Sequence, residues 1–112
     1  MVTIYHNPHC SNSRRALEVI RAAGIEPEIV EYLKTPLSEE SLRALVARTG
    51  QPLRDLIRDK EPAFAELKLA GASEAALFAA VAAHPVLLNR PIVVTAKGAK
   101  LCRPGDQAAD LL

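Results

Sequence analysis

The stretch VTIYHNPHCSNSR, residues 2–14, decides how this chain folds. Its first four residues are β-branched or aromatic, which is typical of a short strand. A polar segment with Pro8 follows, and apolar side chains then recur at helical spacing from Ser11 onward. Cys10 therefore lies where a strand ends and a helix begins. Unpaired backbone N–H groups and the positive end of the helix dipole favour a thiolate at such a position, so Cys10 is a candidate nucleophile.

Outward from this junction, the pattern alternates between short strands and helices. We expect strands over 2–5, 28–33, 91–95 and 99–102. We expect helices over 11–23, from an N-cap at Ser38 to Gly50, over 52–57, over 63–69, from an N-cap at Ser73 to about Ala83, and over 107–112. The order is β-α-β, a helical insertion at about 36–85, then β-β-α. It predicts an α/β protein with a mixed sheet, arranged as a single thioredoxin-like domain over residues 1–112. In such folds a cis-proline opens the third strand and faces the active cysteine, a position that Pro91 would occupy.

The composition excludes several classes of protein. The 112 residues carry 14 basic and 13 acidic side chains, a net charge of +1, which provides no general attraction to nucleic acids or anionic membranes. No apolar run approaches the roughly 20 residues of a membrane span, and no signal peptide is visible. With two cysteines and no disulfide framework, we expect a cytoplasmic monomer that binds neither nucleic acid nor membrane.

The motif around Cys10 is C-x-x-S, with Ser13 in place of a second cysteine. Disulfide cycling within this motif is therefore impossible, and the second sulfur must come from elsewhere. Cys102 lies in an alternating apolar strand and is interpreted as a packed thiol. The Cys-x5-Arg loop of tyrosine phosphatases is absent, because Ala16 stands six residues after the cysteine.

Arginines remote from Cys10 are candidates for binding an anion. Arg90 and Arg103 bracket the predicted hairpin at 91–102, so both project from the same end of two adjacent strands, whereas Arg58 follows a short helix. Guanidinium groups bind tetrahedral oxyanions through paired hydrogen bonds, although any arginine can also be an ordinary surface residue. His6 either stabilises the thiolate or makes a structural hydrogen bond. The histidines and cysteines lack the spacing of a metal site.

Three stretches carry a resemblance to a known family. They are IYHNPHCSNSR at residues 4–14, LLNRPIVVT at residues 87–95 and LCRP at residues 101–104. Together they resemble the glutaredoxin-coupled arsenate reductase family, and the resemblance covers essentially the whole chain. The segment Leu56-Ile57-Arg58 is similar to the family's third arginine segment.

The resemblance implies a reaction and a set of site residues. In the family, the cysteine attacks arsenate, glutathione attacks the resulting adduct, and glutaredoxin resolves the mixed disulfide after arsenite forms. Glutathione is thus a co-substrate, and no tightly bound cofactor or metal is expected. The implied residues are Cys10 as nucleophile, His6, Ser13 and Arg14 as thiolate-stabilising groups, and Arg58, Arg90 and Arg103 as the oxyanion-binding groups.

Two other functions remain compatible with the fold. A transcriptional regulator of the Spx type would bind RNA polymerase, but its redox switch is usually C-x-x-C, whereas this chain has Ser13. A general glutathione-dependent thiol oxidoreductase would use Cys10 and leave the three arginines without a function.

Overall fold

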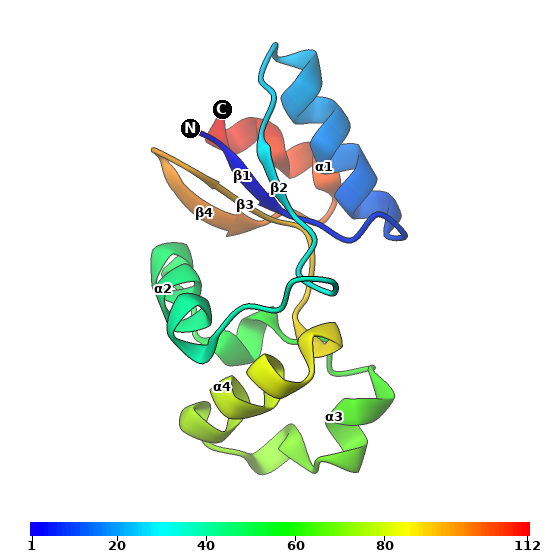
Figure 1. Ribbon diagram of the computed structural model, residues 1–112, viewed down its shortest axis with the longest axis vertical. Coiled ribbons are helices and arrows are strands. Elements are labelled where there is room, and N and C mark those ends of the chain that lie inside the picture. Colours follow the sequence, from blue (N-terminus) through cyan, green and yellow to red (C-terminus); the bar gives the residue numbers. More distant parts are fainter. The chain divides into compact units, whose positions relative to one another are not determined.

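The computed structural model describes all 112 residues, and the chain forms two compact units (Figure 1). The first unit combines Met1–Thr35 with Arg90–Leu112, and the second comprises Pro36–Asn89. The helical stretch expected at about 36–85 falls within the second unit. None of the helices has both the length and the apolar character that a transmembrane span requires.

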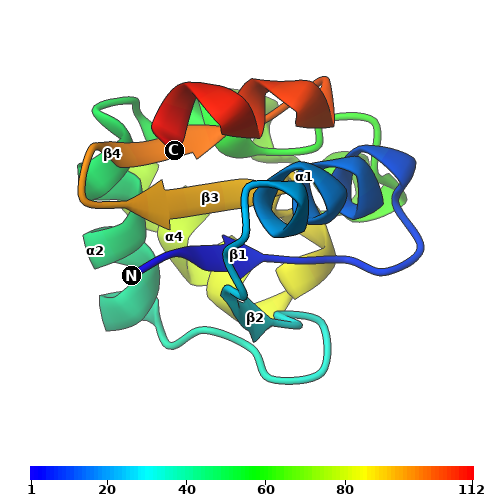
Figure 2. The same ribbon diagram turned by 90° about the horizontal axis from the view of Figure 1, so that it is seen from above.

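A four-stranded mixed sheet organises the first unit (Figure 2). Its strands are β1 (Thr3–Tyr5), β2 (Glu28–Val30), β3 (Ile92–Thr95) and β4 (Gly98–Leu101), in the order β2-β1-β3-β4. Strand β1 pairs in parallel with β2, while the β1–β3 and β3–β4 pairs are antiparallel. A parallel pair needs a crossover connection, which α1 (Ser11–Ala22) provides. The predicted mixed α/β sheet is confirmed.

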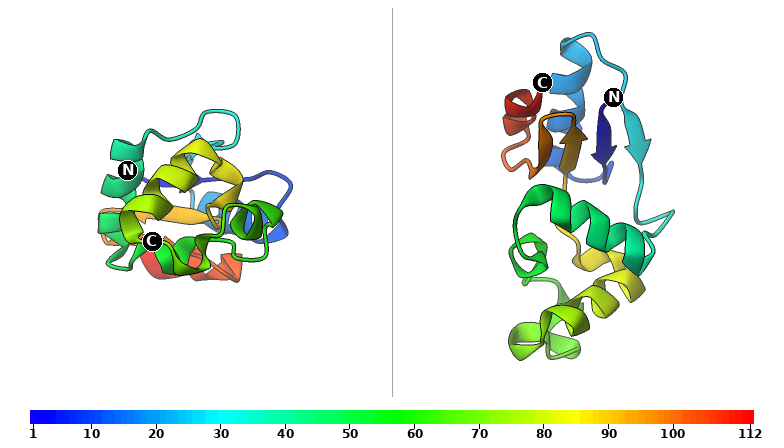
Figure 3. Two further views of the ribbon diagram at one scale, coloured as in Figure 1. Left: turned by 90° about the horizontal axis from the view of Figure 1, so that it is seen from below. Right: turned by 90° about the vertical axis from the view of Figure 1, so that its left-hand side faces the viewer.

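One face of this sheet is covered by α1 and by the 3-10 helix η4 (Gly105–Leu111), which lie side by side (Figure 3). The helix α1 presents Ala16 and Ile20, four residues apart, to the sheet because such positions lie on one helical face. The core beneath the two helices is aliphatic apart from one thiol. Its fully buried members are Ile4, Ala16, Ile20, Val93, Cys102 and Ala108.

Strand β2 is shorter than the predicted 28–33. Its partner β1 has three residues, so the ladder ends at Val30, and the backbone then turns as the Glu31 carbonyl accepts hydrogen bonds from the N–H groups of Lys34 and Thr35. The β3–β4 hairpin forms as predicted, with Gly98 at φ +138°, a conformation that other residues rarely adopt. The Arg90–Pro91 bond is cis, as the fold prediction required, and the Arg103–Pro104 bond is cis as well.

The second unit is helical throughout. It contains α2 (Glu39–Thr49), η1 (Leu53–Leu56), α3 (Pro62–Glu66), η2 (Leu69–Gly71), α4 (Glu74–Ala83) and η3 (Pro85–Leu87). Both predicted N-caps are present, because the Ser38 hydroxyl accepts the Ser41 N–H at 3.0 Å and the Ser73 hydroxyl accepts the Ala76 N–H at 3.2 Å. The helix predicted over 63–69 is interrupted at Lys68, whose φ of 55° is left-handed.

Candidate active site

Cys10 occupies the N-cap position of α1, which is the junction that the sequence predicts. Its own N–H donates to the Asn7 carbonyl at 3.0 Å, and its carbonyl accepts the Arg14 N–H at 3.0 Å, starting the helical hydrogen-bond pattern. The residue is half-buried. The thiol is thus fixed at the positive end of a twelve-residue helix.

Opposing effects set the pKa of Cys10. Partial burial raises the pKa, but hydrogen bonds from the Ser13 N–H, the Arg90 side chain, the Asn12 N–H and the Arg103 side chain outweigh it, and the pKa is lowered overall. Each of these donors stabilises the charged form more than the neutral one, because a thiolate accepts hydrogen bonds far more strongly than a thiol. The larger thiolate fraction makes Cys10 a stronger nucleophile near neutral pH.

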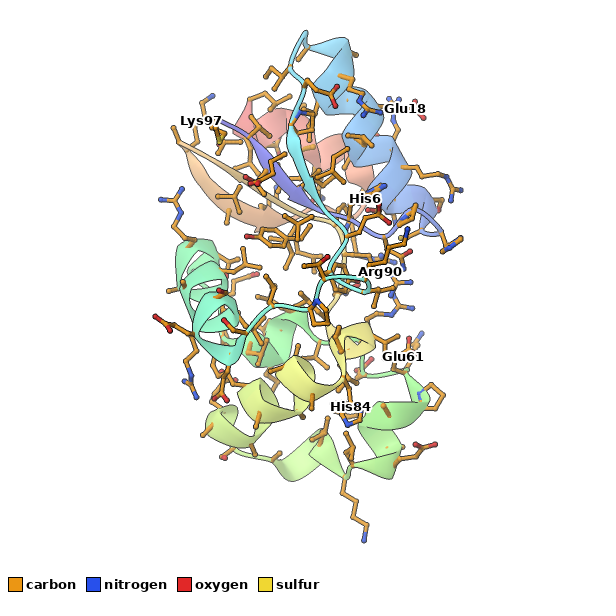
Figure 4. All side chains as sticks on the ribbon, viewed as in Figure 1. His6, Glu18, Glu61, His84, Arg90 and Lys97 are labelled. Atoms are coloured by element: carbon orange, nitrogen blue, oxygen red, sulfur yellow. The ribbon has the colours of Figure 1, made fainter.

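Two arginines that flank the β3–β4 hairpin meet at this sulfur. Arg103 Nη1 lies 3.8 Å from Cys10 Sγ and also donates to the Arg90 carbonyl at 2.9 Å. The Arg90 side chain is half-buried and hydrogen-bonds Cys10 as well. Figure 4 shows Arg90 in the same part of the first unit as His6, near the start of α1. Two guanidinium groups and a helix N-terminus therefore surround one sulfur.

His6 contacts Ser13 rather than Cys10. His6 Nδ1 and Ser13 Oγ share a hydrogen bond of 2.7 Å, and Ser13 Oγ also accepts the Asn7 N–H at 3.0 Å. Burial is the main reason that the pKa of His6 is lowered, which favours the neutral imidazole at pH 7. Of the two interpretations of His6 that the sequence leaves open, the structure shows the hydrogen bond. Any effect of His6 on Cys10 passes through the loop that Ser13 holds together.

Arg14, like His6, hydrogen-bonds the segment around Cys10 rather than the sulfur. Its Nη1 donates to the Pro8 carbonyl at 3.0 Å, and the side chain is exposed. It is not among the groups that lower the pKa of Cys10. The contact ties the first turn of α1 to the loop that precedes Cys10.

Arg58 belongs to the second unit, so its predicted part in the site stays a prediction. Its Nε pairs with Glu61 Oε2 at 3.1 Å, with both side chains about one quarter exposed. The Arg58 N–H donates to the Leu87 carbonyl at 2.8 Å, a backbone contact within the second unit. The pairing leaves the two Nη groups of Arg58 as further donors.

Known proteins resemble this chain in both sequence and structure. A model of the ArsC family matches residues 5–111. The chain belongs to the ArsC family. Relatives include proteins named arsenate reductase from Rhizobium meliloti, 50% identical, and from Escherichia coli, 47% identical; each match covers 99% of this chain and 80–81% of the relative. A solved structure of an arsenate reductase from Vibrio cholerae is 43% identical with a TM-score of 0.94, covering 99% of this chain and 97% of that chain. The predicted thioredoxin-like ArsC fold is confirmed.

Several residues of the site carry no clear signal in the sequence. The backbone N–H groups of Asn12 and Ser13 hydrogen-bond the sulfur, and any residue type at these positions would offer the same N–H groups. The only signal for them in the sequence is therefore the predicted start of a helix. Glu61 could have been noticed, because it follows Arg58 by three residues. No three His, Cys, Asp or Glu side chains are grouped so that they could hold a metal ion.

The two thiols differ in environment, and this difference predicts selective labelling. Cys102 is fully buried, and burial raises its pKa to about 11. At pH 7 iodoacetamide is therefore expected to modify Cys10 much faster than Cys102 in the folded protein, as measured by mass spectrometry of the separated peptides. Unfolding in urea is the control and should bring the two rates close together. Equal rates in the folded protein would contradict the prediction.

The neutral His6 predicts a pH dependence of stability. The pKa of His6 is lowered in the folded protein, whereas in the unfolded chain a histidine has a pKa of about 6.5. Above that pH the imidazole is neutral in both the folded and the unfolded protein, so it does not lower the free energy of unfolding. Below that pH the unfolded state binds the proton more readily, so the free energy of unfolding falls as pH decreases. Urea unfolding at pH 7.5 and 5.5 is expected to show a smaller loss for His6→Gln than for the wild type. His9→Gln, at an exposed position, should retain the wild-type loss.

Proposed function

We propose that this protein reduces arsenate to arsenite, with Cys10 as the nucleophile. The observation that carries the proposal is the convergence of Arg90, Arg103 and the start of α1 on Cys10 Sγ. A sulfur with a lowered pKa beside two guanidinium groups suits attack on a tetrahedral oxyanion. Membership of the ArsC family and relatives named arsenate reductase support arsenate as that oxyanion.

The first step follows from the charges at the site. Arsenate is an anion, and the Arg90 and Arg103 side chains would bind its oxygens and direct its arsenic toward the sulfur. The thiolate attacks arsenic, a sulfur–arsenic bond forms, and one arsenate oxygen leaves as water after protonation. The arginines stabilise the charge that develops on the remaining oxygens. Arg58 is proposed as a third cationic side chain that binds the same arsenate ion.

The electrons must come from thiols outside this chain. Glutathione would attack the adduct; as its sulfur bonds to the sulfur of Cys10, the sulfur–arsenic bond breaks and two electrons pass to arsenic, releasing arsenite. Glutaredoxin would then reduce the mixed disulfide and restore the Cys10 thiol. Ser13 at the fourth position of the motif and the buried Cys102, with its pKa of about 11, support an external second thiol.

Omission of single components tests both the reaction and its electron source. Purified protein, arsenate, glutathione, a glutaredoxin and a system that regenerates reduced glutathione are expected to release arsenite, measured by separating the two arsenic species. Leaving out glutathione or glutaredoxin should reduce the rate to background, and a thioredoxin system should not replace them. Release that thioredoxin alone supports would contradict the proposed electron source, and no release under any condition would contradict arsenate reduction.

A further inference from the structure

The contact between Cys10 and Arg103 joins positions that are 93 residues apart, so another interaction must hold the two segments in register. A second contact with the same separation lies two residues further along both segments. The Gly105 N–H donates to Asn12 Oδ1 at 3.3 Å. Asn12 and Gly105 therefore link the first turn of α1 to the segment that carries Arg103.

Gly105 allows this close approach because it has no side chain. A Cβ atom at Gly105 would lie 2.2 Å from the Asn12 carbonyl oxygen, 2.7 Å from the Ala16 nitrogen and 2.9 Å from Arg15 Cβ. Two of these neighbours are backbone atoms inside α1, which cannot move aside without distorting the helix. The backbone at Gly105 thus lies directly against the helix, and it is buried there.

Asn12 is linked to the sulfur directly through its backbone and indirectly through its side chain. Its backbone N–H hydrogen-bonds Cys10, and its side chain holds the segment in which Arg103 lies two residues before Gly105. A neighbouring ion pair, Arg15 with Asp106 at 2.9 Å, joins the same two segments, but its side chains are 49% and 62% exposed and so constrain the segment weakly. Asn12 is the half-buried link nearest to Arg103.

We propose that Asn12 is a positioning residue, which keeps the Arg103 guanidinium beside Cys10 Sγ by anchoring Gly105 through its side-chain oxygen. The inference rests on the proposed nucleophilic role of Cys10. It assigns to Asn12 no contact with the substrate. When the side-chain oxygen is removed, the Arg103 segment loses its anchor on α1, and the thiolate loses part of the stabilisation that Arg103 provides.

The test measures the pKa of Cys10 from the pH dependence of its alkylation, read on the Cys10 peptide by mass spectrometry. This readout needs no arsenate turnover, so it can fail or succeed independently of the proposed reaction. Asn12→Ala is expected to raise the pKa of Cys10 and leave the unfolding temperature close to that of the wild type, because alanine is a better helix former than asparagine. The matched control is Ser11→Ala, an exposed position in the same turn, which should leave the pKa unchanged.

A double-mutant cycle decides whether Asn12 acts through Arg103. Arg103→Ala alone should raise the pKa of Cys10, and adding Asn12→Ala to it should cause no further rise. An equal rise in both backgrounds would overturn the proposal, because it would mean that Asn12 acts on the sulfur directly. An Asn12→Ala variant with a wild-type alkylation profile would overturn it as well.

Discussion

A Cys10→Ser variant is expected to release arsenite only at the background rate in the glutathione and glutaredoxin assay. The serine hydroxyl remains protonated at neutral pH, is a far weaker nucleophile than a thiolate, and cannot form the disulfide that passes electrons to arsenic. The substitution changes one atom at a half-buried position, so the unfolding temperature should change little. Loss of activity with the fold retained is the result that the proposed chemistry requires.

Cys102→Ala is the matched control for this experiment. Cys102 is buried in the aliphatic core and its pKa is raised to about 11, so it contributes no thiolate at neutral pH. Removing its sulfur should leave turnover near the wild-type rate while a small cavity lowers the free energy of unfolding by about 1 kcal/mol. Retained activity in Cys10→Ser, or loss of activity in folded Cys102→Ala, would contradict the assignment of the nucleophile.

Arg103→Ala and Arg90→Ala are each expected to lower kcat/KM for arsenate by about 100-fold or more, the usual effect of removing one preorganised group that stabilises developing charge. Both side chains hydrogen-bond Cys10, so each loss should also raise the pKa of the thiol. As the pH is lowered, the rate of each variant should therefore begin to fall at a higher pH than the rate of the wild type. The reason is that a thiol with a higher pKa loses its thiolate form at a higher pH.

Two further variants make the arginine experiment specific. Arg21→Ala removes an exposed arginine that pairs with Glu26 at 2.9 Å on the far end of α1, and it should leave kcat/KM unchanged. Arg103→Lys keeps the charge but loses the paired geometry of the guanidinium, so it should recover only part of the rate. If Arg90→Ala and Arg103→Ala turned over arsenate normally, a general thiol oxidoreductase that uses Cys10 alone would be the better description.

Local features of the fold follow directly from the sequence. The helix start at Cys10, the caps at Ser38 and Ser73, and the β3–β4 hairpin depend on neighbouring residues, and all of them appear where the sequence predicts them. Two of the expected elements end earlier than the sequence predicts. Strand β2 ends early because its partner has only three residues, and the helix predicted over 63–69 breaks at the left-handed Lys68.

The sequence left open whether the His6 side chain is charged or neutral, and the burial of this side chain in the folded protein decides between the two. An imidazole at the end of a strand can be cationic or neutral, since its ordinary pKa is close to physiological pH. Burial lowers that pKa, and Ser13 at 2.7 Å occupies its Nδ1. Because burial depends on elements that pack from elsewhere in the chain, the position of His6 alone could not show which form is present.

The sequence by itself determined that a cysteine lies at a strand–helix junction, since helix starts and N-caps arise within a few consecutive residues. It also indicated that Arg90 and Arg103 share one end of a hairpin. Only the tertiary structure decided that Arg103 reaches Cys10 across 93 positions and that Asn12 and Gly105 hold this register. Such contacts depend on how the hairpin and the C-terminal segment pack against α1, where Gly105 lies so close that a Cβ atom would be 2.2 Å from the Asn12 carbonyl oxygen.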